Sequence, residues 1–312
     1  MRAARKSAAY PSIATATSEG VLFVSTMGRF RQMLLKNEFI VAPGAYDCLS
    51  ARSAELAGFP AIYMTGMGTS ASRLGLPDSG LATMSEMVAN ASVMAATVKI
   101  PIIADADTGY GNELNMTRTV HEYERHGAAG IHIEDQVFPK KCGHLDKKQV
   151  IPRQEFVSKI RAAVDARDSL DFIIIARTDC NSVLGFDEAI ARANAGLDAG
   201  ADLALVEAPE SIAQIEKVPR LVQGPCVLNM LLGGKSPVLS LDDLKAVGYR
   251  MVLLSDVLLC AAIHAYDSAL ATVRTSSDPL RFPNTLAVKE IFQRLGAEKW
   301  DRLRVEQEEA SA

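Results

Sequence analysis

One cysteine of this sequence lies in a strongly basic loop. Residues 137–150 read VFPKKCGHLDKKQV, so Cys142 stands among lysines and beside a histidine. A lone cysteine is commonly a small buried hydrophobe. Here, however, Lys140, Lys141 and His144 are close enough in sequence to lower the pKa of the thiol, which would make Cys142 a nucleophile or a proton donor.

The other cysteines stand among apolar or small residues and lack the CxxC spacing of metal sites. We therefore expect packing residues in a reducing compartment and no disulfide framework. These cysteines are Cys48, Cys180, Cys226 and Cys260.

Carboxylates form a second group that could do chemistry. Asp105 and Asp107 occur in the string IIADADTGYG, and a spacing of two residues on a strand end would point both to the same side. Glu134 ends the next apolar run. Grouped carboxylates repel one another unless a cation binds them or one has a raised pKa. Because Mg²⁺ prefers hard oxygen ligands, we expect a Mg²⁺ site here, which Mn²⁺ could also fill.

A nicotinamide cofactor is not expected at this turn. Gly109 and Gly111 follow the aspartates, but the spacing of a dinucleotide fingerprint is absent.

These residues must be positioned by a repeating pattern of short β-rich runs and longer helical segments. Such alternation indicates βα units around a parallel sheet, and eight runs over this length favour a TIM (β/α)8 barrel. The expected strands are 39–42, 61–65, 102–107, 130–135, 172–177, 203–207, 227–230 and 251–254. The clearest expected helices are 86–98, 115–126, 153–167, 186–199 and 242–247.

Polar residues recur at the downstream ends of the expected strands. In a barrel these ends form one rim, where the active sites of such enzymes lie. They include Thr65, Asp105, Glu134, Arg177, Glu207 and Asn229. Strand ends also supply N-caps, and we expect Asp135 and Asp179 to be structural in this way. His132, between two isoleucines, is expected to be an interior histidine of the barrel packing and not a ligand.

Composition sets limits on the class of protein. The chain has 312 residues, of which 48% are hydrophobic and 22% charged, enough for one large core. The formal net charge of −4 offers no general attraction to nucleic acid. No uninterrupted apolar run reaches the roughly 18 residues of a membrane span. We therefore expect a small-molecule ligand and neither a nucleic-acid nor a membrane partner.

The N-terminal segment 1–27 is basic and contains no acid before Glu19. It resembles a weak organelle transit peptide, or it is a flexible tail before a first helix near Phe30. The expected location is cytoplasmic, with a mitochondrial location as the alternative that the basic tail allows.

Over roughly residues 35–275 the chain resembles the isocitrate lyase and phosphoenolpyruvate mutase superfamily. The matching strings, in order, are YMTGMG, GLPD, DADTGYG, GIHIEDQ, KKCGH, ARTD, VEAP and LNM. KKCGH is similar to the signature of methylisocitrate lyase, 2,3-dimethylmalate lyase and oxaloacetate acetylhydrolase, and phosphonate-forming mutases lack it. The resemblance implies a barrel with a C-terminal helical extension exchanged between subunits.

The resemblance also implies roles for individual residues. Cys142 would be the catalytic acid on a mobile lid, with positive groups stabilising an enolate. The implied catalytic residues are Cys142, Tyr63, Lys140, His144 and Arg177. The implied substrate-binding residues are Thr65, Gly66, Met67, Gly143, Glu207 and Asn229, with Asp78 behind them. Asp105, Asp107 and Glu134 would bind Mg²⁺, partly through water.

The implied reaction is Mg²⁺-dependent cleavage of a carbon–carbon bond in a 2-hydroxy di- or tricarboxylate, which releases pyruvate or another 2-oxo acid. Hydrolysis of oxaloacetate to oxalate and acetate is the alternative, because a hydrated ketone presents the same hydroxyl. A non-catalytic scaffold is a third hypothesis, which the intact polar set disfavours. After Asn229 the bacterial methylisocitrate lyases carry a TEFG-like string, whereas this chain has Leu231 and Leu232. Two aliphatic residues favour a 2-alkylmalate over the larger tricarboxylate.

The expected domains are a tail (1–27), a catalytic barrel (28–275) and a helical extension (276–312). The extension includes a helical run from Leu286 to Leu295 and an acidic end. By resemblance it serves a homotetramer; otherwise it is a loosely packed tail.

Overall fold

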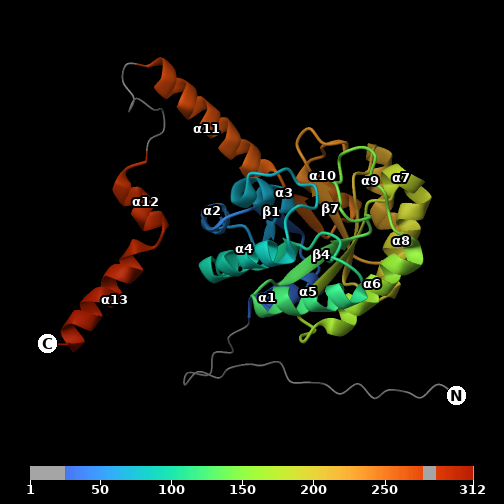
Figure 1. Cartoon of the computed structure of the whole chain (residues 1–312), viewed down its shortest axis with the longest axis horizontal. Helices are drawn as coiled ribbons and strands as arrows, with labels where there is room; N and C mark the ends of the chain where they lie inside the picture. The colour runs from blue at the N-terminus through green and yellow to red at the C-terminus, as the bar shows by residue number, and fades with distance from the viewer. Residues whose placement is uncertain (1–24, 277–285, 312) are drawn as a thin grey trace. The chain divides into compact units, whose positions relative to one another are not determined.

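Eight parallel strands close into a barrel in chain order (Figure 1). The computed structural model describes residues 25–276 and 286–311. The strands are β1 (Ile40–Ala45), β2 (Ile62–Met64), β3 (Ile102–Asp105), β4 (Gly130–Glu134), β5 (Ile173–Thr178), β6 (Leu203–Val206), β7 (Cys226–Met230) and β8 (Met251–Leu254). All eight expected strands are present, and the predicted TIM barrel is confirmed.

Helices follow the strands and cover the outside of the barrel (Figure 1). They are α1 (Thr26–Leu35), α2 (Cys48–Leu56), α3 (Gly66–Thr69), η1 (Ser70–Leu74), α4 (Met84–Thr97), α5 (Glu113–Arg125), α6 (Arg153–Ala166), α7 (Asn181–Leu184), α8 (Phe186–Asp198), α9 (Ile212–Leu221) and α10 (Leu241–Val247). Local signals set several starts: Thr83 and Glu86 form a reciprocal capping box before α4.

Alternation along the strands separates the inside of the barrel from the outside. Ile131 and Ile133 pack outward with the helices, whereas Ile173 and Ile175 belong to the inner core. The same alternation carries His132 and Glu134 to the inside. Polar side chains at inward positions near the strand ends therefore form the uppermost layer of the barrel interior.

The strand register brings these inward residues together. Asp105 on β3 pairs with His132 on β4, and Glu134 on β4 pairs with Arg177 on β5. The parallel sheet thus assembles the site from residues far apart in sequence.

The helix before the barrel begins at Thr26, where Ser25 accepts a hydrogen bond from the Gly28 N–H. Phe30 is fully buried, in agreement with a first helix near this residue. Nearly all of the expected tail, including its targeting signal, lies outside the described residues.

The chain divides into two compact units after Leu259. The second begins within α11 (Val257–Thr275) and contains α12 (Val288–Arg294) and α13 (Ala297–Ala310). The division falls before the expected boundary at residue 275, because α11 has no buried residue. Helix α12 matches the expected helical run, and the acidic end is a helix as well.

Helix α11 is exposed and apolar. By length and composition alone it is the one helix among the described residues that could cross a membrane. His264, Asp267 and Arg274 interrupt its apolar sequence. One such helix is weak evidence for insertion, and the expectation of no membrane partner stays a prediction.

Candidate active site

A cavity with about 320 Å³ of empty volume opens at the carboxyl ends of the strands. It brings the Asp105 carboxylate and the Cys142 thiol to one space, as the sequence pattern predicted. The lining residues are Tyr63, Thr65, Met67, Asp78, Asp105, Cys142, Gly143, His144, Arg177, Glu207, Asn229, Leu231 and Ser255.

Asp105 is held by several donors. One carboxylate oxygen, Oδ2, accepts from the Tyr63 hydroxyl at 3.1 Å and from the Gly66 N–H at 3.2 Å. The other, Oδ1, accepts from the Asp107 N–H at 3.0 Å. Burial alone would raise the pKa of Asp105, but positive charges around it lower the pKa below its usual range. Asp105 is therefore ionised.

The Gly66 backbone was expected to hold the substrate. In this structure its N–H is engaged by Asp105, and a Cβ at Gly66 would lie 2.4 Å from Asp105 Oδ2. The glycine therefore permits the close approach of the carboxylate.

Tyr63 and His132 form a stacked pair beside this carboxylate. Their ring centroids are 5.3 Å apart, and Tyr63 Oη lies 2.7 Å from His132 Nε2. The Tyr63 hydroxyl thus bridges His132 and the Asp105 carboxylate. Burial lowers the pKa of His132 and raises that of Tyr63 well above its usual range. Both rings are neutral. His132 is interior, as expected, but it belongs to the site and not to the packing alone.

Asp107 lies just after β3 and not on the strand itself, so the strand spacing that we expected to align the two carboxylates does not extend to it. Strand β3 ends at Asp105, and Asp107 adopts a left-handed backbone with φ of 47°. Its Oδ1 lies 2.9 Å from Lys140 Nζ, which also donates to Asp78 Oδ1 at 2.5 Å. Burial raises the pKa of Asp107 to about 6, against the lowering effect of Lys140. Lys140 is thus neutralised by two acids, and its charge does not act freely on Cys142.

Glu134 is fully buried and does not line the cavity. Both of its oxygens are buried without a hydrogen-bond partner, although Arg177 Nη2 lies 3.2 Å from Oε2 without hydrogen-bond geometry. Burial raises the pKa of Glu134 well above its usual range. Unpaired carboxylate oxygens of this kind are suited to a cation or to water.

The predicted three-carboxylate cluster is wrong as a ready-made cage. Within residues 25–276 and 286–311, no three His, Cys, Asp or Glu side chains lie together as a metal site. Asp107 contacts Lys140, and Glu134 lies beside Arg177 without a hydrogen bond. Mg²⁺, however, is usually held by one or two carboxylates with waters and substrate oxygens. The ionised Asp105 and the unpartnered Glu134 fit that mode.

The thiol of Cys142 was expected to have a lowered pKa. Burial instead raises it above its usual range. The expectation failed because Lys140 faces Asp78 and Asp107, and because Lys141 is exposed. A protonated thiol suits proton donation and not nucleophilic attack.

His144 lies between two loops. Its Nδ1 accepts a hydrogen bond from the Lys235 N–H at 2.9 Å. Its Nε2 lies 3.2 Å from Glu207 Oε1 without hydrogen-bond geometry. The ring is therefore held beside the acid of the cavity wall.

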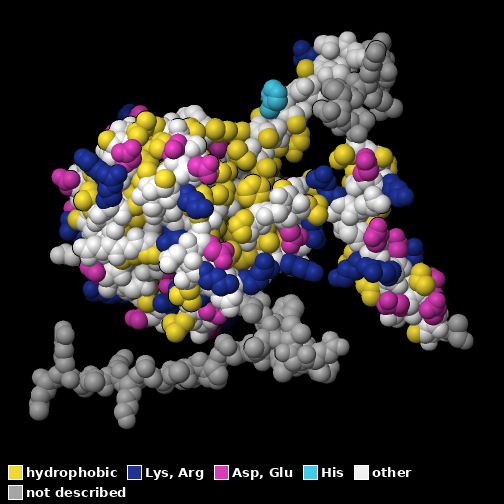
Figure 2. All heavy atoms as spheres, turned by 180° about the vertical axis from the view of Figure 1, so that it is seen from behind, with side chains coloured by type: hydrophobic (Ala, Val, Ile, Leu, Met, Phe, Trp, Pro, Cys, Tyr) yellow, Lys and Arg dark blue, Asp and Glu magenta, His cyan; other side chains and the backbone are white. Residues whose placement is uncertain are grey.

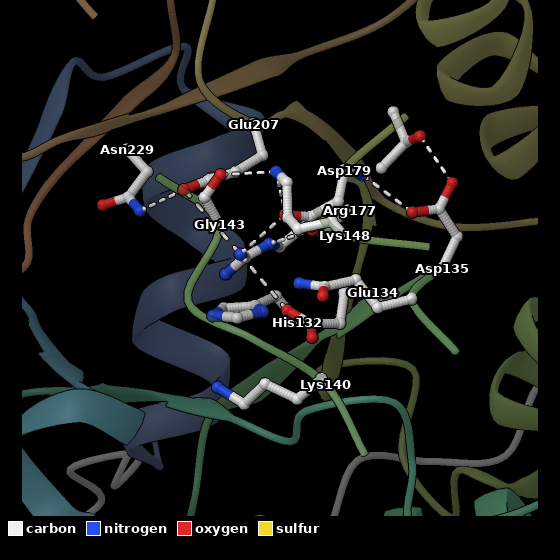
Figure 3. A network of polar contacts seen from close by, with 12 residues as sticks. His132, Glu134, Asp135, Lys140, Gly143, Lys148, Arg177, Asp179, Glu207 and Asn229 are labelled. Carbon is white, nitrogen blue, oxygen red and sulfur yellow. Dashed lines mark hydrogen bonds and ion pairs between the residues drawn. The ribbon is translucent and has the colours of Figure 1, made fainter. Parts of the chain in front are cut away.

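Arg177 is the principal cation of the cavity, and Figure 3 shows it among the acids of the network. Its Nε donates to Asp179 Oδ2 at 2.9 Å, and Nη2 donates to Asp179 Oδ1 at 3.3 Å. Nη2 also lies 3.7 Å from Glu207 Oε1. Burial alone would lower the pKa of Arg177, but these acids raise it. The guanidinium is charged and tightly oriented.

Glu207, Asn229 and Ser255 form the far wall. Asn229 Nδ2 donates to Glu207 Oε1 at 2.9 Å, and the Ser255 hydroxyl donates to Asn229 Oδ1. Burial alone would raise the pKa of Glu207, but Arg177 lowers it below its usual range. Glu207 Oε2 has no hydrogen-bond partner, which leaves an acceptor for a substrate hydroxyl.

Asp135 and Asp179 are structural, but they are not the N-caps we expected. Helices α6 and α7 are preceded by Pro152 and Cys180. Asp135 accepts from the Asp179 N–H at 2.7 Å and also binds Thr178 and Arg192. Both acids therefore act as ion-pair partners beneath the rim.

All five cysteines lie within the described residues, and none of them forms a disulfide. Cys180 and Cys226 are buried as expected for packing, whereas Cys48 is half-buried and Cys260 is exposed.

Eleven of the residues proposed from the sequence line the cavity, and four lie outside it. Those outside are Gly66, Asp107, Glu134 and Lys140. No role was predicted for Ser255 or Lys148, and His132 was predicted to be a packing residue. Inward alternation along β4 and β8 could have found His132 and Ser255.

Comparison with known proteins decides the family. The model of the family described as phosphoenolpyruvate phosphomutase matches residues 30–274. The chain belongs to the phosphoenolpyruvate phosphomutase family. The resemblance inferred from the motifs is thus confirmed.

Curated relatives of this family member include named lyases. It is 45% identical over 230 residues to 2,3-dimethylmalate lyase of Eubacterium barkeri, covering 74% of this chain and 80% of the relative. It is 42% identical to 2-methylisocitrate lyase of Aeropyrum pernix, covering 78% of each chain. The family member is therefore an enzyme of the lyase class.

Solved structures agree. Oxaloacetate acetylhydrolase in complex with 3,3-difluorooxaloacetate superposes with a TM-score of 0.87 at 38% identity, covering 92% of this chain and 98% of that one. A 2,3-dimethylmalate lyase, described as a PEP mutase/isocitrate lyase superfamily member, gives 0.86 at 37% identity, covering 91% and 96%. A phosphonopyruvate hydrolase structure with oxalate and Mg²⁺ gives 0.81 at 31% identity, covering 90% and 98%.

Proposed function

We propose that this enzyme is a Mg²⁺-dependent carbon–carbon lyase acting on a 2-hydroxy dicarboxylate of the 2-alkylmalate type. The observation that carries the proposal is the shared cavity of an ionised carboxylate, Asp105, and a protonated thiol, Cys142. Cleavage of the bond next to the carbon that carries the hydroxyl requires stabilisation of negative charge on the hydroxyl oxygen. The carbon released at the other end of the bond must receive a proton.

Asp105 and Glu134 would hold the Mg²⁺, which when bound supplies Lewis-acid polarisation of substrate oxygens. The protein residues supply the remaining functions. Tyr63 keeps its proton and donates a hydrogen bond to Asp105, and Arg177 provides a fixed guanidinium for the substrate carboxylate. Glu207 offers its free oxygen to a hydroxyl.

Cys142 is then the proton donor to the carbon released by cleavage. The substrate hydroxyl first loses its proton to water, and its oxygen becomes the carbonyl oxygen of the 2-oxo acid as the adjacent carbon–carbon bond breaks. The electron pair of that bond moves onto the departing fragment as a carboxylate-stabilised carbanion, and the thiol proton moves to that carbon. The thiolate that remains regains a proton from water before the next turnover. The raised pKa keeps the proton on sulfur until the carbanion forms. Partial burial of Cys142 beside the cavity places this proton donor closer to the carbanion than bulk water.

The wall of the cavity favours a dicarboxylate. Leu231 lines it and is 8% exposed, so a third carboxylate at this wall would lose water without gaining a charged partner. Leu232 does not line it and is 56% exposed. The preference for a dicarboxylate therefore depends on Leu231 and not on Leu232.

The test is a screen of 2-hydroxy di- and tricarboxylates with Mg²⁺, in which the 2-oxo acid product is measured. We expect the highest kcat/KM with a 2-alkylmalate and loss of turnover after chelation of the metal. Faster turnover of 2-methylisocitrate would contradict the dicarboxylate assignment, and turnover unaffected by chelation would contradict the metal requirement.

Hydrolysis of oxaloacetate is the second candidate. The superposition on oxaloacetate acetylhydrolase supports it, because the matched structure carries an analogue of that substrate. The same screen should include oxaloacetate, with oxalate and acetate as the measured products. Stoichiometric oxalate with no cleavage of any 2-hydroxy acid would replace the lyase by the hydrolase.

We also propose that the enzyme works as a homotetramer in which the C-terminal unit packs on a neighbouring copy. Support comes from α11, where Ile263, Tyr266 and Leu270 are 49%, 64% and 67% exposed within a single chain. Figure 2 shows apolar side chains on the surface of this helix. An apolar stripe left in water is unfavourable, and a second copy would cover it.

A further inference from the structure

One buried lysine of the loop after β4 is not used by the proposed reaction. Lys148 lies near the end of the loop, and its side chain is only 1% exposed. Its Nζ donates to the Gly143 carbonyl and to Asp179 Oδ1, the latter at 2.9 Å. A buried ammonium is costly unless it is paired. Both of its described partners belong to the surroundings of the cavity (Figure 3).

The Asp179 end of this contact is fixed to the barrel. Asp179 follows β5, binds the Arg177 guanidinium with both oxygens, and donates its own N–H to Asp135 at 2.7 Å. The carboxylate therefore has a set position and direction, so Lys148 is attached to a rigid point.

The Gly143 end of the contact is next to the thiol. Gly143 fits so closely that an added Cβ would lie 2.6 Å from both Arg177 Nη2 and Glu207 Cγ. Because Cys142 is its chain neighbour, the position of the Gly143 carbonyl sets where the thiol enters the cavity.

The first half of the loop has a separate attachment. Gln136 donates from its side chain to the Lys141 carbonyl at 2.7 Å and accepts from the Lys141 N–H at 3.0 Å. This pair fixes the chain before Cys142, whereas Lys148 acts after it.

We propose that Lys148 is a positioning residue that holds the Cys142–Gly143 segment over the cavity by joining the Gly143 carbonyl to Asp179. The inference deepens the proposed function, since it takes Cys142 as the proton donor. Lys148 itself touches no reacting atom and acts through the loop backbone.

The test compares Lys148→Met with Lys147→Met in the full chain. Lys147 is the exposed neighbour, and its side chain does not line the cavity. The probe is iodoacetamide, and alkylation of Cys142 is followed by peptide mass spectrometry across a range of pH. We expect Cys142 to react about tenfold faster in Lys148→Met at every pH, as fits the loss of one charge-assisted hydrogen bond. Lys147→Met should react like the unmodified protein.

Turnover gives a second readout. On whichever substrate the screen identifies, kcat of Lys148→Met should fall by up to about a hundredfold, the loss that a small misplacement of a reacting group can cause. KM should change much less, because Arg177 and Glu207 remain in place. Lys148→Gln removes the charge with less disturbance and serves if Lys148→Met does not fold.

Unchanged Cys142 reactivity in a folded variant would overturn the proposal, whatever its thermal stability. A reactivity profile that only moves along the pH axis would overturn it too, since Lys148 would then act on the pKa of the thiol. The alkylation assay needs no substrate. It therefore decides this inference even where the screen finds no lyase activity.

Discussion

The pKa of the Cys142 thiol is raised, whereas its basic neighbours in the sequence predicted a lowered pKa. Sequence proximity to lysines suggested a thiolate, but in the folded chain burial dominates and Lys140 is bound by Asp78 and Asp107. The proton on sulfur is therefore retained. A thiol that keeps its proton fits the proposed proton donor better than a nucleophile.

Replacing Cys142 by alanine should remove the proton donor without disturbing the pocket. We expect kcat to fall by about 10²- to 10⁴-fold, the range for loss of a general acid. Binding of oxalate in the presence of Mg²⁺, measured by calorimetry, should change little because Asp105 and Arg177 are retained. A variant that keeps more than a tenth of the activity would remove Cys142 from its role.

The pH dependence follows from the same thiol. The active form is protonated and is lost as pH rises through the pKa, which burial raises. The alkaline limb of kcat should therefore lie above pH of about 8.5, the ordinary value for cysteine. Stopped-flow measurement of kcat against pH checks this, and an alkaline limb near pH 7 would contradict it.

Gly143 tests how closely the loop must approach. In Gly143→Ala the new Cβ would lie 2.6 Å from Arg177 Nη2, so the loop or the guanidinium must move. We expect kcat/KM to fall by about a hundredfold. Leu145→Ala, at an exposed position of the same loop, should be nearly neutral. Equal activity of the two variants would show that the approach is not required.

Much of the candidate site could be predicted because strand ends meet at one rim. Thr65, Arg177, Glu207 and Asn229 were placed by that rule alone. It failed for Asp107, whose left-handed backbone no spacing reveals, and for Lys148, whose importance depends on a contact with a backbone carbonyl. The pKa of Cys142 failed because burial cannot be read from sequence neighbours.

The order and type of the barrel strands could be predicted from the sequence, because each strand is a short apolar run buried on both faces of the sheet. Strand ends were less certain. β3 stops at Asp105, two residues before the expected end, because the chain turns there. Such a turn depends on tertiary contacts and not on the apolar pattern.

Asp135 joins three of these elements. It lies at the end of β4 and accepts from Thr178 on β5 and from Arg192 on α8. Asp135→Ala would leave the buried Thr178 hydroxyl and Asp179 N–H without this acceptor and would leave Glu188 as the remaining carboxylate partner of Arg192. We therefore expect a loss of about 3–5 kcal/mol in the free energy of unfolding. Denaturant titration followed by circular dichroism measures it. The exposed Asp165→Ala should change stability by less than about 0.5 kcal/mol. A similar small loss for both variants would contradict the structural role.

Helix α11 carries the surface on which the proposed homotetramer depends. Its exposed apolar side chains recur at Ile263, Tyr266, Leu270 and Val273, a helical spacing that gives one stripe. Ser268 lies on the opposite side of the helix. The stripe is the surface that a neighbouring copy would cover.

Leu270→Glu should therefore break the proposed tetramer into smaller species, because it places a charge in the stripe that a neighbouring copy would bury. Light scattering after size-exclusion chromatography measures the mass. Ser268→Glu is the matched control and should keep the tetramer. A monomeric unmodified protein would refute the assembly, and a tetramer in both variants would remove α11 from the interface.

The loop after β4 leaves and returns at a single point, since Gln136 and Val150 form an antiparallel bridge. Its two ends are thus joined independently of what lies between them. Residues 137–149 could be exchanged as one continuous cassette, provided that the replacement keeps lysines to pair with Asp107 and Asp179. Because Cys142 lies within this segment, such an exchange would replace the proposed proton donor while the strands of the barrel stay in place.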